Sequence, residues 1–389
     1  ALISSDGGPQ AQTAILARGL GLPAIVAAKG VTDIADGTIV YVDSNEGIVD
    51  TEPTDADREA AIKYANRKPV ADFDGQGVLA DGTRVPLYAN VGDGKSAEKA
   101  ASLKAEGVGL LRTEFGFLGH DAEPSIETQA KTYKSVFDAF PGKHIVVRTL
   151  DAGADKPLPF LNVNPEENPA LGVRGFRTDW TVPGVLTRQL EAIKAASENS
   201  DADIWVMAPM ISTTSEARNF ANMLKEIGLP VHGVMVETPA AVMNAEAILG
   251  EVDFVSIGTN DLTQYTMAAD RLLGDLAHLN NPWQPAVLKM IKMTVEGAQR
   301  ASVTAGKKKY VSVCGEAAAD PALAVVLIGL GVDTLSMNAG AIPAVAAVLK
   351  SVTKEKAQQI AAIALQQISS AEAKESARQA LPILDELGL

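Results

Sequence analysis

The sequence predicts an α/β protein whose larger part is a (β/α)8 barrel, preceded by part of a smaller α/β domain. Two observations support this fold class. Short apolar runs alternate with longer helical segments after residue 72, a pattern typical of βα units around a parallel sheet. Eight such runs fill a length suited to a barrel of roughly 250 residues with insertions. The runs are residues 86–90, 108–111, 144–147, 204–207, 233–236, 253–257, 310–313 and 333–337.

The sequence divides into three regions. Residues 1–52 combine a Gly-rich turn, a stretch with helical apolar spacing and two strand-like runs, which predicts part of an α/β domain. Residues 53–72 begin near a proline and become charged and helical, which predicts a linker helix. Residues 73–389 contain the barrel and an Ala-rich helical tail. Because the chain opens within a motif and without Met, we expect it to be a piece of a longer protein.

Composition narrows the class of protein and its partners. Hydrophobic residues make up 47% and charged residues 21%, and no apolar run approaches the roughly 20 residues of a membrane span, so we expect a soluble protein. The start lacks the pattern of a signal peptide, and a single cysteine favours the cytoplasm. A net charge of -14 disfavours nucleic acid or an anionic membrane as partner. An anionic substrate would need local arginines and a metal.

Polar residues follow almost every apolar run, where the carboxyl ends of barrel strands form active sites. Taken alone, each has an ordinary explanation as a solvated, paired or helix-capping side chain. Their repeated placement after successive runs indicates one shared site. These residues are Asn90, Arg112, Glu114, Arg148, Asp151, Glu237, Asn260, Asp261, Cys314, Glu316 and Asn338.

Five motifs carry a specific resemblance. They are LLRTEF (110–115), ENPALGVRGFR (167–177), VMVETPAA (234–241), SIGTNDLTQYTMAADR (256–271) and SVCGEAA (312–318). Together they resemble enzyme I of the bacterial sugar phosphotransferase system, a phosphoenolpyruvate–protein phosphotransferase and a PEP-utilising enzyme. The resemblance implies a TIM barrel that binds phosphoenolpyruvate (PEP) and releases pyruvate, a swivelling phosphohistidine domain, the phosphocarrier protein HPr as partner, and a homodimer.

Two other functions stay open. Pyruvate phosphate dikinase and PEP synthase share the architecture and parts of GTNDLTQ and CGE, although RTEF and TQYTMAADR look more like enzyme I. A catalytically silent protein that senses PEP through domain closure is an alternative of another class.

The substrate explains why arginines would gather at the barrel mouth. PEP carries roughly three negative charges on a carboxylate and a phosphate, and guanidinium groups bind both types of group in a bidentate manner. The ordinary alternative is surface arginines paired with the abundant carboxylates. The resemblance assigns substrate binding to loop arginines after the strands, namely Arg112, Arg148, Arg174 and Arg271.

Glu237 and Asp261 follow neighbouring runs and could chelate one hard cation, which we expect to be Mg²⁺ or Mn²⁺. The resemblance supports this ligand pair and adds Asn260, whose amide would hold the phosphate. The alternative is that Asp261 is the N-cap of the following helix.

Cys314 is the only thiol, and a lone Cys in an apolar strand is more often inert. Loss of phosphoryl from PEP leaves the enolate of pyruvate, which needs a general acid at carbon 3. By resemblance to the CGE motif, Cys314 is the proton donor and Glu316 supports it.

The phosphoryl acceptor departs from the family pattern. Residues 7–26 resemble the phosphohistidine segment of enzyme I, but Gln12 stands at the position of the His and Ala11 at that of a Ser. A carboxamide is not a usable nucleophile at neutral pH, so we expect no phosphorylation at Gln12. The helical domain that docks HPr also precedes this segment in the family. The histidines of this chain, all in the barrel region, are His120, His144, His232 and His278.

Overall fold

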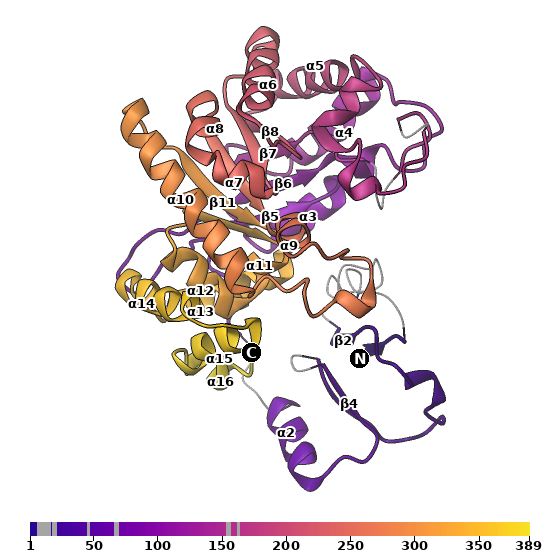
Figure 1. Ribbon diagram of the computed structural model, residues 1–389, viewed down its shortest axis with the longest axis vertical. Coiled ribbons are helices and arrows are strands. Elements are labelled where there is room, and N and C mark those ends of the chain that lie inside the picture. Colours follow the sequence, from indigo (N-terminus) through magenta and orange to yellow (C-terminus); the bar gives the residue numbers. More distant parts are fainter. Residues whose placement is uncertain (6–16, 18–21, 45–46, 66–69, 153–156, 162–163) are drawn as a thin grey trace.

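The computed structural model describes residues 1–5, 17, 22–44, 47–65, 70–152, 157–161 and 164–389. Figure 1 shows a small N-terminal part beside a large barrel surrounded by helices. Ala11 and Gln12, the expected acceptor segment, lie outside the described residues. The elements of the small part are β1 (Leu2–Ile3) paired in parallel with β2 (Ala24–Ile25), the 3-10 helix η1 (Val31–Asp33), β3 (Tyr41–Asp43) antiparallel to β4 (Ile48–Asp50), and α2 (Asp55–Ala65).

The eight apolar runs are confirmed as strands of one closed parallel barrel, in which each strand pairs with the next and the last pairs with the first. The runs are rich in Val, Ile and Leu because barrel strands are covered on both faces. In chain order the strands are β5 (Leu87–Val91), β6 (Gly107–Arg112), β7 (His144–Arg148), β8 (Asp203–Ala208), β9 (His232–Val236), β10 (Phe254–Gly258), β11 (Tyr310–Cys314) and β12 (Thr334–Met337).

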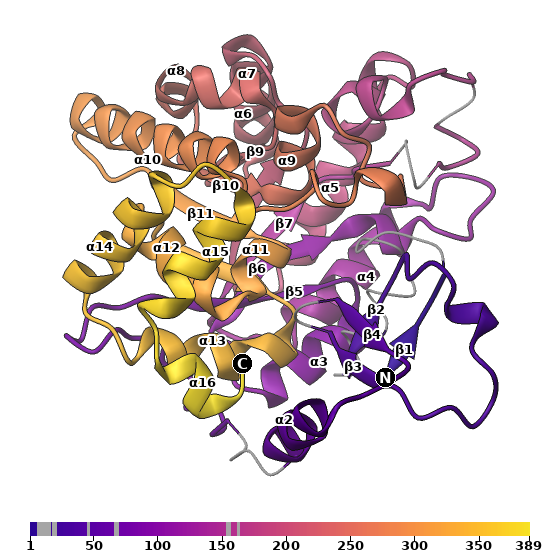
Figure 2. The same cartoon turned by 60° about the horizontal axis from the view of Figure 1, so that its bottom comes forward.

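Helices connect successive strands and cover the outside of the barrel, as the two views in Figures 1 and 2 show. The first are α3 (Gly94–Ser102), α4 (Ile126–Phe137), α5 (Val185–Ser197), α6 (Thr214–Ile227), α7 (Pro239–Met243) and α8 (Ala245–Glu251). The later ones are α9 (Thr259–Met267), α10 (Pro285–Ala305), α11 (Glu316–Ala319), α12 (Pro321–Gly329) and α13 (Ile342–Leu349). Short 3-10 helices are η2 (Thr113–Gly116), η3 (Pro169–Leu171), η4 (Gly175–Trp180), η5 (Gly274–Leu276) and η6 (Ala339–Ala341).

Three C-terminal helices, α14 (Lys354–Leu365), α15 (Ser370–Gln379) and α16 (Ile383–Leu387), complete the Ala-rich tail. Helix α14 lies against α12 at Gly329, where an added Cβ would come within 2.1 Å of the Ala357 carbonyl oxygen. Gly329 therefore allows the two helices to approach closely, because a side chain at this position would clash with the backbone of α14.

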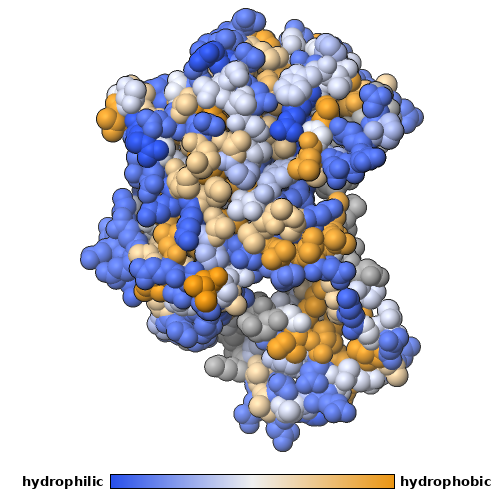
Figure 3. All heavy atoms as spheres, viewed as in Figure 1, coloured by the Kyte–Doolittle hydropathy of each residue, from blue (hydrophilic) through white to orange (hydrophobic). Residues whose placement is uncertain are grey.

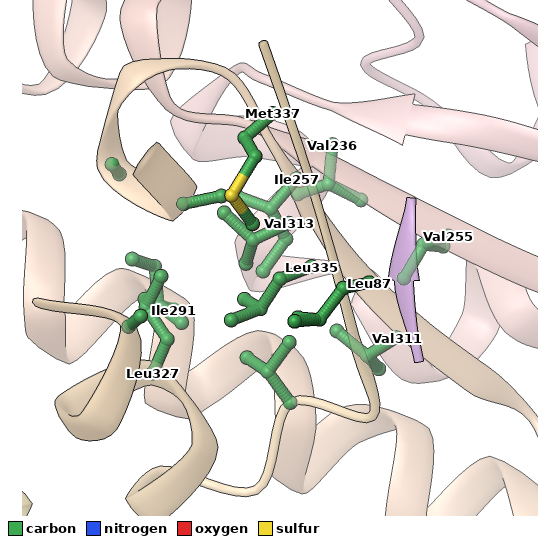
Figure 4. Packing of buried hydrophobic residues seen from close by; sticks show 14 of the residues in the cluster. Leu87, Val236, Val255, Ile257, Ile291, Val311, Val313, Leu327, Leu335 and Met337 are labelled. Atoms are coloured by element: carbon green, nitrogen blue, oxygen red, sulfur yellow. The ribbon is translucent and has the colours of Figure 1, made fainter. Parts of the chain in front are cut away.

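The main core lies between the strands and the surrounding helices. Figure 4 shows Leu87, Val311 and Leu335 from the strands near Ile291 of α10 and Leu327 of α12. All five side chains are buried. Burial of each such side chain contributes roughly 1.5–3 kcal/mol, so this layer is a main source of barrel stability.

Aromatic rings occupy the amino end of the barrel. The Trp205 ring lies 4.4 Å from His144, 4.9 Å from Phe254 and 5.9 Å from Tyr310, measured between ring centroids. His144, Phe254 and Tyr310 are the first residues of β7, β10 and β11. This packing leaves the carboxyl ends of the strands as the place for a ligand site.

The outer surface is mostly hydrophilic on the face drawn in Figure 3, with separate apolar patches. Within the described part of the chain, none of the helices has the length and apolar character needed to cross a membrane.

Candidate active site

The strand ends bring the predicted residues to one end of the barrel. Arg112 and Arg148 are the last residues of β6 and β7, so these two arginines belong to strands rather than to the following loops. Arg174 lies in the long connection after β7, and Arg271 comes after α9 rather than directly after a strand. Glu237 directly follows β9.

Arg148 is a buried cation between carboxylates. Its Nη2 donates to Glu114 Oε1 at 2.9 Å, and its Nη1 lies 3.2 Å from Asp151 Oδ2. Burial disfavours the charged guanidinium, but Glu114, Asp151 and Glu237 outweigh this effect and raise the pKa of Arg148. The site therefore contains a permanent positive charge at the end of β7.

Arg174 lies between two aspartates and is 3% exposed. Its Nη2 and Nε donate to Asp151 at 2.9 and 3.2 Å, and its Nη1 and Nη2 donate to Asp261 at 2.8 and 3.3 Å. Arg271 approaches the same Asp261, with Nη1 3.3 Å from Oδ2. These arginines do pair with carboxylates, but they do so in the interior rather than on the surface.

Glu237 lies against the end of β10 and is 1% exposed. Its Oε1 accepts a hydrogen bond from the backbone N–H of Met210 at 2.7 Å, and Met210 has a left-handed φ of 59°. Gly258 makes room for this carboxylate, because an added Cβ would lie 2.7 Å from Oε2. Burial, followed by the charges of Asp261 and Asp151, raises the pKa of Glu237.

Asp261 is not the N-cap of α9, so that alternative is wrong. The helix begins at Thr259, its N-cap is Gly258, and Asp261 is the third helical residue. Its carboxylate instead accepts hydrogen bonds from Arg174 and Arg271. A carboxylate in the first turn still gains from the helix dipole.

The donor set fits a hard divalent cation. Glu237 follows β9 and Asp261 lies in the first turn of α9, just after the neighbouring strand β10. Burial, and then the negative charges of Asp261 and Asp151, raise the pKa of Glu237. Within the described ranges, no group of three or more His, Cys, Asp or Glu side chains could hold a metal by itself. Mg²⁺ is often bound by one or two carboxylates together with water and substrate phosphate, so a pair is sufficient.

Cys314 ends β11 and its side chain is buried. Its Sγ lies 3.6 Å from the Ile257 carbonyl oxygen, and burial is the main effect that raises the pKa of the thiol. Gly315 follows with a φ of 108°, and an added Cβ there would lie 3.7 Å from Asn260 Oδ1. Glu316 then opens α11. Asn260, Cys314 and Glu316 thus lie on adjoining segments of the site.

Glu114, Asp151 and Tyr265 contact the arginines of the site, and the sequence assigns them no role. Glu114 and Asp151 follow strands, but their pairing with Arg148 depends on contacts that no local pattern reveals. The Tyr265 hydroxyl donates to the Ala170 carbonyl and accepts from Arg174 Nη1 at 3.4 Å. A pocket of about 470 Å³ opens beside these groups, and its lining includes Leu171, Arg174, Tyr265, Arg271 and Leu272.

Comparison with known proteins identifies the family. Residues 70–354 match the PEP-binding domain of PEP-utilising enzymes, and residues 1–47 match the mobile domain of those enzymes. A phosphoenolpyruvate-protein phosphotransferase of Streptomyces coelicolor is 45% identical over 97% of this chain and 68% of that protein. One of Haloferax volcanii is 38% identical over 96% of this chain and 67% of that protein.

A multiphosphoryl transfer protein of Xanthomonas campestris pv. campestris is 39% identical over 94% of this chain and 44% of that protein. The chain thus spans about two thirds of the first two relatives and less than half of the third. Because the PEP-binding domain covers most of the chain and the identity to the first two relatives extends over nearly all of it, the chain belongs to the family of PEP-utilising enzymes.

Proposed function

We propose that this chain carries the PEP-dependent step of a phosphoenolpyruvate–protein phosphotransferase. In a protein with His at position 12, the barrel binds PEP, the phosphoryl group passes to that His of the mobile domain, and pyruvate leaves. This chain has Gln12 there and should not accept the phosphoryl group itself. The observation that carries this proposal is the buried group of Arg148, Arg174, Glu237 and Asp261 at the carboxyl end of the strands. The names of the relatives support the phosphotransferase activity. The resemblance to enzyme I adds later transfer to HPr in sugar transport, in the cytoplasm, to this proposal.

The arginines bind and orient the substrate. Arg112, Arg148 and Arg271 bring positive charge to the phosphate and carboxylate, and Asn260 donates its amide to the phosphate. Glu237 and Asp261 would hold Mg²⁺ or Mn²⁺, which supplies Lewis-acid stabilisation of charge on the phosphoryl oxygens when bound. Fixed charge and positioning account for most of the catalysis in phosphoryl transfer.

Cys314 completes the formation of pyruvate. When the phosphorus–oxygen bond of PEP breaks, the electron pair stays on oxygen and gives the enolate. The Cys314 thiol donates its proton to carbon 3, and the resulting thiolate regains a proton from solvent. Burial favours this role, because it raises the pKa of Cys314 and keeps the thiol protonated at neutral pH. Glu316, two residues further along the chain, is the supporting residue.

Gln12 determines whether this chain can accept phosphate. The double change Ala11→Ser and Gln12→His is expected to restore an imidazole acceptor without altering the barrel. Incubation with labelled PEP and Mg²⁺ should then yield an acid-labile, base-stable phosphoprotein, while the unmodified chain should stay unlabelled. The measurement is label retained on the protein after acid and after base treatment.

The N-terminal extension is the control for that experiment. The same two changes are also placed in a protein that carries additional residues upstream of residue 1. Label on only the extended protein would mean that the mobile domain needs those residues. Absence of label on both proteins would contradict position 12 as the acceptor site and would favour a protein that binds PEP without transferring its phosphoryl group.

A silent PEP sensor is the second candidate function, and Gln12 is the observation that favours it. It predicts the same metal-dependent binding of PEP but no phosphoprotein after the acceptor is restored. A dikinase or synthase has less support, because the relatives from Streptomyces coelicolor and Haloferax volcanii are named phosphoenolpyruvate-protein phosphotransferases. The labelling experiment therefore separates the two main candidates.

We also propose that residues 73–389 form the barrel unit and that this unit forms a homodimer. Ile363 and Ile368 in the C-terminal region are 42% and 87% exposed. A dimer interface in this region would cover these two apolar side chains. Sedimentation at tens of micromolar is expected to give twice the chain mass of 40.6 kDa, with PEP and Mg²⁺ present or absent. A monomer under both conditions would contradict the homodimer.

A further inference from the structure

Arg174 already uses every donor it has. A guanidinium carries five N–H donors. Its Nε–H points to Asp151 Oδ1, the two N–H of Nη2 point to Asp151 Oδ2 and Asp261 Oδ2, and those of Nη1 point to Asp261 Oδ1 and the Tyr265 hydroxyl. In this arrangement, Arg174 cannot donate a hydrogen bond to an anionic ligand until it releases one of these partners.

Asp261 is equally occupied. Its Oδ1 accepts from Arg174, and its Oδ2 accepts from both Arg174 and Arg271. A cation that binds to this carboxylate must therefore compete with the Arg174 guanidinium, which lies on both oxygens. Arg174 is 3% exposed, so a guanidinium displaced from Asp261 would be costly unless a new anion replaced the lost partner.

We propose that Arg174 is an exchangeable counter-ion that couples cation binding to substrate binding. In the ligand-free protein it neutralises Asp261. When a divalent cation and PEP bind together, Arg174 gives up Asp261, keeps Asp151, and turns its freed Nη donors to an anionic oxygen of PEP. This inference rests on the proposed function, because it assumes that Glu237 and Asp261 hold the cation.

Asp151 is the positioning residue in this exchange. It accepts from the Nε and Nη2 edge of Arg174, and Asp151 Oδ2 also lies 3.2 Å from Arg148 Nη1. Asp151 therefore fixes two arginines, Arg148 at the end of β7 and Arg174 in the connection that follows this strand. The bidentate contact holds Arg174 near the site while the opposite edge changes partner.

The exchange has a thermodynamic consequence. Separation of Arg174 from Asp261 costs free energy, and once one ligand has bound, the other binds without this full cost. Mn²⁺ and PEP therefore raise the affinity of each other by the same factor. Calorimetric titration of Mn²⁺ with and without PEP measures this factor, expected to be about 5–150-fold. In Arg174→Gln, Mn²⁺ alone should bind about tenfold or more tightly, PEP should bind more weakly, and the factor should fall toward one.

Arg271→Gln is the matched control for charge. It removes an equal charge from beside the same Asp261, but Arg271 Nη1 lies 3.3 Å from that carboxylate and its side chain is more exposed than that of Arg174. The Arg271→Gln protein should retain the coupling factor even where PEP binds more weakly. Arg174→Lys keeps the positive charge but lacks the planar guanidinium that contacts both aspartates. Its Mn²⁺ affinity should therefore lie between those of the unmodified protein and Arg174→Gln.

The outcomes distinguish this inference from the function on which it rests. If Mn²⁺ binding requires Glu237 but Arg174→Gln leaves both the Mn²⁺ affinity and the coupling unchanged, the exchange is wrong and the proposed cation site stands. If PEP binds the unmodified protein equally well in chelator, the cation site itself fails. Circular dichroism confirms folding, and Arg174→Lys replaces Arg174→Gln if the latter does not fold.

Discussion

Glu237→Gln should strongly weaken the metal-dependent binding of PEP. The substitution keeps the side-chain shape and an oxygen that can accept from the Met210 N–H, but removes one of the two carboxylates that would hold the cation. We expect the affinity for Mn²⁺ with PEP to fall by about 100-fold or more, equivalent to roughly 2.7 kcal/mol. Calorimetry with Mg²⁺ or Mn²⁺, repeated in chelator, measures the effect.

Glu316→Gln is the control for this prediction. It removes the same charge from the same end of the barrel, at the start of α11, but from a residue outside the proposed ligand pair. The cation affinity of Glu316→Gln should stay within a few-fold of the unmodified protein. Equal losses in the two variants, or binding of PEP that chelator does not change, would remove Glu237 from the cation site.

Arg148→Met should lower the free energy of unfolding more than the other substitutions proposed for this protein. It leaves Glu114 and Asp151 buried without the guanidinium that they contact, and Glu114 is 1% exposed. Removal of one partner from a buried ion pair costs roughly 3–5 kcal/mol because the other charge stays in the interior. The free energy of unfolding from urea titration of each variant measures this cost.

Arg188→Met tests whether burial is the cause. Arg188 also makes two contacts with a glutamate, at 2.9 and 2.6 Å to Glu123, but its side chain is 40% exposed, against 9% for Arg148. Exposed pairs contribute about 0–1 kcal/mol. Similar losses for the two variants would contradict the role of burial. The double variant Arg148→Met with Glu114→Gln should recover part of the loss.

The barrel could be predicted because each strand is a local pattern. Runs of Val, Ile and Leu predict strands that are covered on both faces. All eight predicted runs correspond to barrel strands, and their ends differ by about one residue from those in the structure. The common placement of Arg148, Glu237 and Asp261 then follows from the barrel itself, since parallel strands present their carboxyl ends at one edge.

The partners within the site could not be predicted in this way. Arg174 comes 26 residues after the end of β7, and no local pattern says that its connection folds back onto Asp151 and Asp261. Asp261 looked like a helix cap because Asp before an apolar stretch often caps, whereas α9 begins two residues earlier. Such errors arise wherever a tertiary contact decides the role of a side chain.

The aromatic packing at the amino end of the barrel has an optical consequence. The chain has three tryptophans. Trp205 lies among other rings in that packing, and Trp283 is 3% exposed with its Nε1 bound to Asp320. Trp180 is 61% exposed and ends η4, the 3-10 helix that Arg174 precedes. Iodide should therefore quench the emission of Trp180 selectively, so that rearrangement of the connection carrying Arg174 can be followed in real time without an attached dye.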